Sequence, residues 1–508
     1  MNQKKVGVIL SYITQAVQII SGVIYTPVML RILGQSEYGL YQLVYSVVSY
    51  LSLLSLGFSG AYLRYYSRYK AEHNNEEVAR LNGLFLTIYT IMSSVCLLCG
   101  FFMIQNIEMI FGTGLSTAEY AKAKILMTLM VIGMAVSFPT SLFDGYSSAR
   151  EKFFAPRVFD LLRVLLNPFI TLPVLLLGYG SVGMIIVSTV LTLSAFLGKL
   201  IYCLKSLKMR FLFKKFKLCL FLDMCSFTFF IFINQIIDQI NWNVDKIILA
   251  RYAGTVATAI YSIGSSLNNY YISFSSTVTG VFGPQVNRIV AESQYNNRED
   301  EGNKELTDIF IKVGRIQFEI LAMVLSGIIL FGRQFIELWA GNGYEKSYYV
   351  ALLLLIPETI PLIQNVGITI QRAKNMHRVR SIVYFFVAIA NIGITLVLAK
   401  LYGPTGAAAG TAISMIAGNC IFMNIYYHKK IKINIIQFWK EIGTIIPSVL
   451  MSFIVGYFVL KLFTYLNISW LFSGAVYVLA YVVFLIRFGM NDYEKSLIYK
   501  LCNRKERM

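Results

Sequence analysis

The stretch Ser181-Val-Gly-Met-Ile-Ile-Val-Ser-Thr-Val-Leu-Thr-Leu-Ser-Ala-Phe-Leu-Gly198 carries no charged side chain and belongs to an apolar run over 181–204. A helix of this length crosses roughly 30 Å of hydrocarbon. Lipid offers the backbone no hydrogen-bond partner, whereas a helix satisfies its own backbone groups. The stretch therefore predicts a membrane-spanning helix.

Similar runs follow one another along the whole chain. The 508 residues are 56% hydrophobic and 14% charged, with a mean hydropathy of +0.62, whereas soluble domains carry about 25% charged residues. These features predict an all-α integral membrane protein of about fourteen transmembrane helices. The predicted spans are 6–30, 39–63, 81–104, 124–146, 158–178, 181–204, 220–244, 256–286, 308–332, 348–371, 379–401, 404–427, 441–464 and 467–488.

The net charge of +19 is carried by short segments between the apolar runs. This distribution is the positive-inside pattern of cytoplasmic loops, and it predicts that both termini are cytoplasmic. No basic domain outside the membrane is left to bind nucleic acid. The longest hydrophilic stretch, 292–308, is expected to be a solvated cytoplasmic loop, so no extramembrane domain houses a conventional active site. The basic segments include Lys205, Lys208, Arg210, Lys214, Lys215, Lys217, Arg504, Lys505 and Arg507.

The two halves of the chain share an internal repeat. Arg31, Gly34 and Tyr41 recur 220 residues later as Arg251, Gly254 and Tyr261. Two further sets keep nearly the same offset: Pro139, Gly145, Arg150 and Lys152 recur as Pro361, Gly367, Arg372 and Lys374, and Tyr179, Gly180 and Gly183 as Tyr402, Gly403 and Gly406. A six-span offset restores the orientation, so the repeat predicts two six-helix bundles related by a parallel pseudo-twofold. Such repeats are typical of transporters whose substrate site lies between the lobes.

The repeat sets the predicted domains. Residues 1–217 form the N-terminal six-helix lobe, and residues 218–440 form the C-terminal six-helix lobe. Residues 441–508 add a helical hairpin of two transmembrane spans and a basic cytoplasmic tail.

Two stretches resemble a known family. They are Ile24-Tyr-Thr-Pro27 with Leu30-Arg-Ile-Leu-Gly-Gln-Ser-Glu-Tyr-Gly-Leu-Tyr41, and Asn241-Trp-Asn-Val-Asp-Lys246 leading to Tyr261-Ser-Ile-Gly264. Both are similar to Wzx-type polysaccharide flippases of the multidrug/oligosaccharidyl-lipid/polysaccharide (MOP) exporter superfamily, and the likeness extends over essentially the whole chain. It implies a V-shaped arrangement of the two bundles, which also occurs in MATE transporters.

The resemblance also implies a function. It implies an undecaprenyl-diphosphate-linked oligosaccharide as substrate, alternating access, a bacterial inner membrane location and a role in surface polysaccharide assembly. No cofactor is expected, and transport is expected to be coupled to H⁺ or Na⁺. Besides the lipid bilayer and the lipid-linked oligosaccharide, other polysaccharide assembly proteins are candidate partners, and we expect a monomer. Alternatives are a multidrug exporter or a lipid II (peptidoglycan-precursor) flippase of the same fold, or a membrane-embedded glycan polymerase or transferase.

The seventh predicted span carries the densest set of polar residues. Ionisable side chains inside spans are costly, so each is a candidate for a function or for a buried partner. The principal members Asn234, Asp238, Asn241 and Asp245 follow one another at four, three and four residues, which places them on one helical face. This face predicts either a cavity wall that binds glycan hydroxyls or a coupling cation, or a helix end among headgroups. The set comprises Asn234, Gln235, Asp238, Gln239, Asn241, Asp245 and Lys246.

The next spans add further candidates. Glu358 lies between Pro357 and Pro361, which weaken the helical hydrogen-bond ladder, and burial of its carboxyl suits proton coupling. Arg315 and Glu319 are spaced for a buried i,i+4 ion pair, and the alternative is that Arg315 binds diphosphate. Asn268 and Asn269, beside two tyrosines, are candidates for stacking and hydrogen bonding to sugars.

Arg31 and Arg251 occupy equivalent repeat positions at the predicted outer ends of their spans. A guanidinium fork suits diphosphate oxygens, while snorkelling to headgroups is the alternative. The cavity cations of the family are not carried over, because the first span has no arginine before Arg31.

Overall fold

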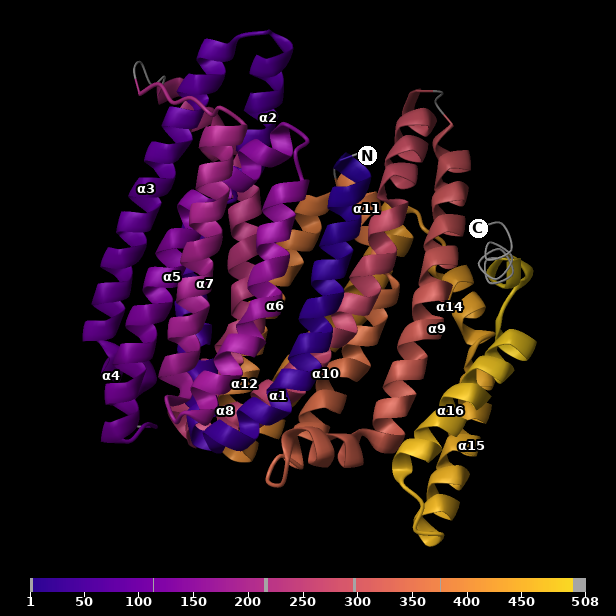
Figure 1. The fold of residues 1–508 in the computed structure, drawn as a ribbon. Helices are drawn as coiled ribbons and strands as arrows, with labels where there is room; N and C mark the ends of the chain where they lie inside the picture. Colours follow the sequence, from indigo (N-terminus) through magenta and orange to yellow (C-terminus); the bar gives the residue numbers. More distant parts are fainter. Residues whose placement is uncertain (1–2, 113, 214–217, 296–297, 375, 497–508) are drawn as a thin grey trace. The chain divides into compact units, whose positions relative to one another are not determined.

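The computed structural model describes residues 3–112, 114–213, 218–295, 298–374 and 376–496, and it contains no β-strand within these residues (Figure 1). The basic residues Lys214, Lys215, Lys217, Arg504, Lys505 and Arg507 lie outside this part. The chain divides into two compact units, Met1–Ser262 and Ile263–Met508. The unit boundary falls within α8, and the predicted lobes 1–217 and 218–440 stay a prediction.

Helices α1 to α7 precede α8, which reaches from the first unit into the second. They are α1 (Gln3–Ser49), the 3-10 helix η1 (Tyr50–Ser55), α2 (Phe58–Ala71), α3 (Asn75–Gln105), α4 (Ile107–Phe111), α5 (Thr117–Ala149), α6 (Phe154–Leu176), α7 (Gly180–Ile201), the π-helix η2 (Tyr202–Ser206) and α8 (Leu218–Tyr295).

The remaining helices belong to the second unit. They are α9 (Glu299–Ala340), α10 (Lys346–Ile363), α11 (Val366–Ala373), α12 (His377–Met415), the π-helix η3 (Ile416–Phe422), α13 (Met423–Tyr426), the π-helix η4 (Tyr427–Ile431), α14 (Ile435–Gly443), α15 (Ile446–Tyr465), α16 (Trp470–Phe484) and the π-helix η5 (Leu485–Gly489).

Eleven helices in the described part are long and apolar enough to cross a membrane. Three of them are interrupted by a glycine with a non-helical backbone: Gly34, Gly254 and Gly403. If each interrupted helix counts as two spans, the total equals the fourteen that the sequence predicts. The chain is therefore an all-α multi-pass membrane protein, and the count of fourteen stays a prediction.

Large apolar side chains on the outside of the helices support the membrane assignment. Phe101 is 62% exposed, and Phe386 and Phe458 are each 64% exposed. A soluble monomer rarely exposes many such groups together, but in lipid they meet a solvent as apolar as themselves.

The first unit packs helices that are both near and far apart in the sequence. Helix α5 contacts α3 and α7, and α6 contacts α1 and α7. Asn74 and Ser116 begin α3 and α5 as N-caps, and Ser116 forms a capping box with Glu119. Each cap satisfies backbone N–H groups that the first helical turn leaves open.

The second unit packs α10 against α9 and α12, and the hairpin of α15 and α16 against α9. The amphipathic helix α14 precedes this hairpin and buries Phe438 against Phe310 of α9, with ring centroids 4.8 Å apart. Polar groups also join the hairpin to α9, because Tyr481 donates a hydrogen bond to the Glu319 carbonyl oxygen at 2.8 Å.

The internal repeat reappears in the backbone. Gly34 (φ 75°, ψ 174°) and Gly254 (φ 79°, ψ −176°) adopt nearly the same conformation, which only glycine adopts readily. Gly180 and Gly403 also share a positive φ, of 57° and 61°. The repeat therefore encodes matching chain reversals, while the pseudo-twofold itself stays a prediction.

The structure corrects one local expectation. The described residues of the stretch 292–308 are helical except Arg298, because α8 continues to Tyr295 and α9 begins at Glu299. Its polar residues instead lie on helix ends, where acidic groups in the first turn of α9 favour helix formation.

Helix α10 runs through both Pro357 and Pro361 and ends at Ile363, and the Cys420 thiol contacts the Pro357 carbonyl oxygen at 3.6 Å. That carbonyl is the one left without a helical donor by Pro361.

Candidate functional site

The polar residues of α8 before Gly254 contact α1 and η1 within the first unit. Gln239 accepts hydrogen bonds from the Ser49 hydroxyl at 3.1 Å and from the Asn243 amide at 2.6 Å. Its own amide donates to the Ser52 hydroxyl at 3.1 Å. These contacts form a chain of amide and hydroxyl groups on buried or half-buried helix faces. Such groups suit the recognition of sugar hydroxyls because they both donate and accept.

A charged pair lies two turns further along α8. Asp245 is fully buried and accepts a hydrogen bond from the Tyr261 hydroxyl at 2.5 Å. Its neighbour Lys246 is only 8% exposed. Burial of charged groups is expensive unless they are paired and hydrogen-bonded. The Asp245 contact therefore contributes to the local structure across the Gly254 reversal.

The two glycine reversals meet at one polar cluster. Glu119 at the start of α5 accepts hydrogen bonds from the Ser36 hydroxyl at 2.7 Å and the Thr255 hydroxyl at 2.8 Å. The two hydroxyls are 3.2 Å apart. We name Ser36, Glu119 and Thr255 the elbow cluster, because Ser36 follows Gly34 and Thr255 follows Gly254.

The backbones approach closely beside the elbow cluster. A Cβ atom on Gly39 would lie 1.9 Å from the Thr255 carbonyl oxygen, far inside van der Waals contact. Only glycine at this position lets α1 and α8 come so near. The elbow is thus a tight contact between α1 and α8. A small number of hydrogen bonds join it, and each of them involves at most one charged group.

The other predicted residues of α8 differ in their surroundings. Asp238 is exposed, Asn241 is half-buried, and the side chain of Asn234 lies outside the described residues. Gln235 has a buried amide oxygen with no hydrogen-bond partner among the described residues. The face is therefore partly satisfied by protein and partly open to a further partner.

The predicted candidates of the second unit lie on three helices. Asn268 of α8 is 2% exposed, and its amide oxygen has no hydrogen-bond partner among the described residues, whereas Asn269 is exposed. Glu358 of α10 is 9% exposed and lies beside Thr359, which bonds the Tyr271 hydroxyl at 2.7 Å. Tyr271, one of the two tyrosines that were expected to stack on sugars, is therefore buried in helix packing.

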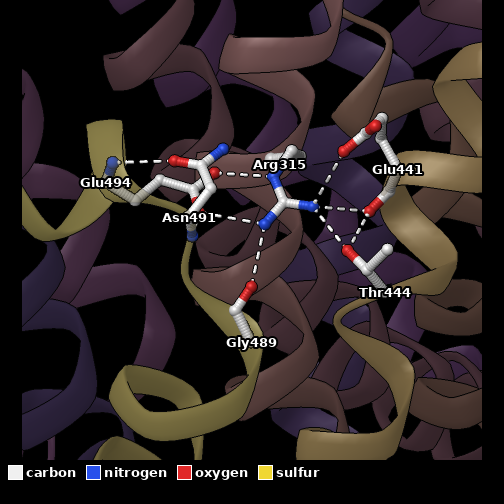
Figure 2. A network of polar contacts seen from close by, with 6 residues as sticks. All are labelled: Arg315, Glu441, Thr444, Gly489, Asn491 and Glu494. Atoms are coloured by element: carbon white, nitrogen blue, oxygen red, sulfur yellow. Dashed lines mark hydrogen bonds and ion pairs between the residues drawn. The ribbon is translucent and has the colours of Figure 1, made fainter.

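Arg315 of α9 does not form the i,i+4 ion pair with Glu319 that its spacing favours. Figure 2 shows that its guanidinium points to the C-terminal segment instead. The Nε and Nη2 groups bind Glu494 at 2.7 and 3.0 Å, and Nη2 also binds the Gly489 carbonyl at 2.8 Å. Nη1 donates to the Glu441 carbonyl at 2.6 Å and to the Thr444 hydroxyl at 2.7 Å. All five N–H groups of the guanidinium are therefore used within the second unit.

The paired arginines of the repeat are both exposed. Arg31 and Arg251 lie three residues before Gly34 and Gly254, respectively. The Arg251 side chain also passes close to Gly112. Their exposure fits either phosphate binding or snorkelling, and the phosphate assignment stays a prediction.

A pocket of about 130 Å³ lies at the junction of α5 and α6, away from the polar face of α8. It is lined by Asp144, Ser147, Ser148, Lys152, Phe153, Pro156 and Arg157, and it includes none of the predicted site residues. Beside it, the buried Lys199 ammonium joins Asp144 and Asp160 at 2.8 and 2.9 Å. That ion-pair cluster ties α5, α6 and α7 together. Among the described residues, no group of His, Cys, Asp and Glu is arranged to hold a metal ion.

A sequence profile described as polysaccharide biosynthesis protein matches residues 5–290, more than half of the chain. The chain belongs to the polysaccharide biosynthesis protein family. This confirms the resemblance to polysaccharide flippases that the sequence motifs indicate.

Solved structures agree with the family on the fold. The chain is similar to the lipid II flippase MurJ in an inward closed conformation, with a TM-score of 0.68, 17% identity and coverage of 97% of this chain and 99% of the other. An inward-facing multidrug resistance MATE family transporter of the MOP superfamily has a TM-score of 0.66 and 12% identity, with 81% and 94% covered. No curated protein sequence matches the chain. The fold is therefore that of the MOP superfamily.

Several residues of this family member were not predicted from sequence. Ser49 and Ser52 are ordinary small residues of a span, and no pattern marks them as partners of Gln239. Asn243 stands within the quoted motif but off the predicted polar face. Glu494 follows Asn491 with the spacing of a helix N-cap, a signal for the cap but not for its pairing with Arg315.

Proposed function

We propose that this protein moves an undecaprenyl-diphosphate-linked oligosaccharide across the bacterial cytoplasmic membrane for surface polysaccharide assembly. It acts as a transporter and not as an enzyme, with both termini in the cytoplasm. One observation carries the proposal. The chain belongs to the polysaccharide biosynthesis family and shares its fold, over nearly its whole length, with a lipid II flippase.

The polar face of α8 supports this substrate class. A lipid-linked glycan presents hydroxyls and anionic phosphates, while its tail stays in lipid. Gln239, Asn243 and the serines of η1 and α1 offer donors and acceptors at membrane depth. Amides and hydroxyls in a wet site bind sugars without fixing one charge state, so they tolerate the neutral part of the substrate.

The elbow cluster suits a gate for alternating access. If the predicted lobes 1–217 and 218–440 separate there, the bond from Thr255 to Glu119 and the Thr255–Ser36 contact break, while the Ser36–Glu119 bond stays within the N-terminal lobe. Each hydrogen bond stabilises by about 1 kcal/mol net, and bonds to a charged group by about 1.5–3 kcal/mol. A transport cycle tolerates a cost of this size, because Glu119 forms hydrogen bonds to water once the elbow has opened.

A disulfide across the elbow tests the gate. In a Ser36→Cys/Thr255→Cys variant, oxidation should stop export and a reductant should restore it. Oxidation of each single variant and of the native chain, which has seven cysteines, provides the controls. Undiminished export by a fully cross-linked protein would show that the elbow does not open.

Deletion of the gene tests the function itself. We expect loss of one surface polysaccharide and accumulation of its lipid-linked repeat unit on the cytoplasmic side. An unchanged surface glycan without this intermediate, in a strain with no second flippase, would refute the proposal. If the gene instead encoded a membrane-embedded polymerase or transferase, its deletion would leave unpolymerised units on the outer side.

A multidrug exporter is the second candidate, favoured by the fold shared with MATE transporters. Expression in a dye-sensitive host discriminates, because a drug exporter lowers dye accumulation and a glycan flippase does not. A lipid II flippase of the same fold would rescue a strain that lacks its own peptidoglycan-precursor flippase.

Coupling to H⁺ or Na⁺ belongs to the same proposal, with buried Glu358 as the candidate proton carrier. Glu358→Gln should abolish the response of export to a collapsed proton gradient while insertion stays normal. If export by Glu358→Gln still followed the proton gradient, the coupling group would lie elsewhere.

A further inference from the structure

The Arg315 site contains more acid than base. Glu494 and Glu319 are 3% and 6% exposed, and the Glu441 carboxylate lies 3.5 Å from the guanidinium but is 41% exposed. One buried guanidinium therefore faces two buried carboxyls. If both were ionised, the site would hold an uncompensated buried charge, which is strongly unfavourable.

Glu494 holds the ionised position. Its two oxygens accept both bonds from Arg315, and Oε2 also accepts the Asn491 backbone N–H at 2.7 Å (Figure 2). Burial acts to raise the pKa of Glu494, but the bonds from Arg315 and Asn491 outweigh burial and hold the pKa below its usual value. Asn491 in turn accepts the Glu494 N–H at 2.9 Å, so the cap that begins the helix after Asn491 also presents the carboxylate to α9.

Glu319 receives nothing from Arg315, whose N–H groups are all used. One of its carboxyl oxygens is buried and has no hydrogen-bond partner among the described residues, and Glu319 lies one turn after Arg315 on the face of α9 from which Arg315 binds Glu494. Two carboxylates cannot bond one another, because neither has a proton to donate. A protonated Glu319 removes the excess charge and donates to Glu494.

Among the described residues, no other basic side chain forms an ion pair with either of these buried carboxyls. The charged or titratable groups around it are Arg315 on α9, Glu441 on α14, and Tyr481 on α16, whose hydroxyl binds the Glu319 carbonyl. Lys312, one turn before Arg315, lies over the Tyr493 ring at 5.3 Å from its centroid.

We propose that Glu319 and Glu494 form a proton-binding site that holds residues 491–496, and with them the end of the hairpin, against α9. While the proton is bound, the segment stays docked. When it is lost in alkaline medium, repulsion between the two carboxylates loosens the segment. The site uses none of the residues of the elbow cluster or of the α8 polar face, so it stands or falls apart from the proposed transport function.

Thermal unfolding of the purified protein in detergent, from about pH 5 to about pH 9, tests the site. The folded protein holds one proton more than the unfolded chain above the usual glutamate value of about 4.3, so this site lowers stability as pH rises. Glu319→Gln keeps the shape and the donor but cannot ionise. Its Tm should match wild type near pH 5 and exceed it by about 3 °C or more near pH 9.

Glu441→Gln is the matched control, because it removes an exposed carboxylate from the same arginine. Its Tm difference from wild type should not grow with pH in this way. Hydrogen exchange of residues 491–496, corrected for intrinsic rates, reads the docking directly: it should quicken at high pH in wild type and stay slow in Glu319→Gln. If Glu319→Gln does not fold, exchange in wild type decides alone. Exchange of this segment that is independent of pH, or a Tm difference that is equal at both ends, overturns the proposal.

Discussion

The two polar regions of this membrane protein, the α8 face in the first unit and the Arg315 site in the second, solve different problems. Arg315 is 2% exposed and every N–H has an acceptor. On the α8 face, Asp238 is exposed and the Gln235 amide oxygen has no hydrogen-bond partner among the described residues. A guanidinium whose five N–H groups are all used has no capacity left for a ligand, whereas the unpartnered amide oxygen of Gln235 has.

This difference separates structural from binding residues better than depth in the membrane does. Sequence alone treats every ionisable residue in a span as a candidate, because each is costly there. The cost is met in two ways, by a protein partner or by water and substrate. Counting donors and acceptors tells which of the two applies, and it assigns Arg315 to packing.

The largest expected effect is the loss of Arg315. Arg315→Ala leaves the Glu494 carboxylate buried without its partner, which should destabilise the protein by about 3–5 kcal/mol. Thermal unfolding in detergent measures it. Arg288→Ala, an arginine 66% exposed in an ion pair with Glu292, should change stability by about 0–1 kcal/mol. Equal effects of the two would erase the contrast between the regions.

A smaller effect is expected at the elbow. Gly39→Ala places a methyl group where the Thr255 carbonyl lies, which should cost about 1–3 kcal/mol through strain or weaken closure of the elbow. Gly60→Ala is the control, since a Cβ there meets no atom within 4 Å, and it should be neutral or slightly stabilising. A Gly39→Ala protein with native stability and normal export would show that the close contact is dispensable.

The sequence predicted the positions of the helices better than the partners of the polar side chains. Hydropathy reports burial in lipid, and the repeat located Gly34 and Gly254, because local backbone demands leave local signals. Arg315 and Glu494 are 179 residues apart, and neither carries a mark of the other. Spacing placed Arg315 beside Glu319, but in the folded protein its N–H groups bind the end of α14 and the segment after α16. The polar face of α8 was foreseen from period, while Ser49 and Ser52 were not, since serine is common in spans.

Gln239 tests the α8 face with a moderate effect. Gln239→Ala removes bonds to Ser49, Ser52 and Asn243 and should cost about 1–3 kcal/mol of stability. If the predicted α8 face binds the substrate, export should fall further than this loss of stability explains, because the Gln239 amide is then missing from that face. Complementation of the deletion strain, at matched membrane levels, measures export. Gln105→Ala, an exposed glutamine at the end of α3, is the control and should export normally.

The smallest change in stability belongs to Asp238. Because its side chain is exposed, Asp238→Asn should alter stability by less than about 0.5 kcal/mol. If the side chain faces the substrate path, removal of its charge still lowers export in the complemented deletion strain. Asp300→Asn, at the exposed start of α9, loses a charge outside that path and should leave export intact. A defect in Asp238→Asn alone, with unchanged Tm, separates a cavity residue from a structural one in the way Arg315 cannot. Normal export from both variants would place Asp238 toward lipid headgroups and leave Gln239 and its neighbours as the binding face.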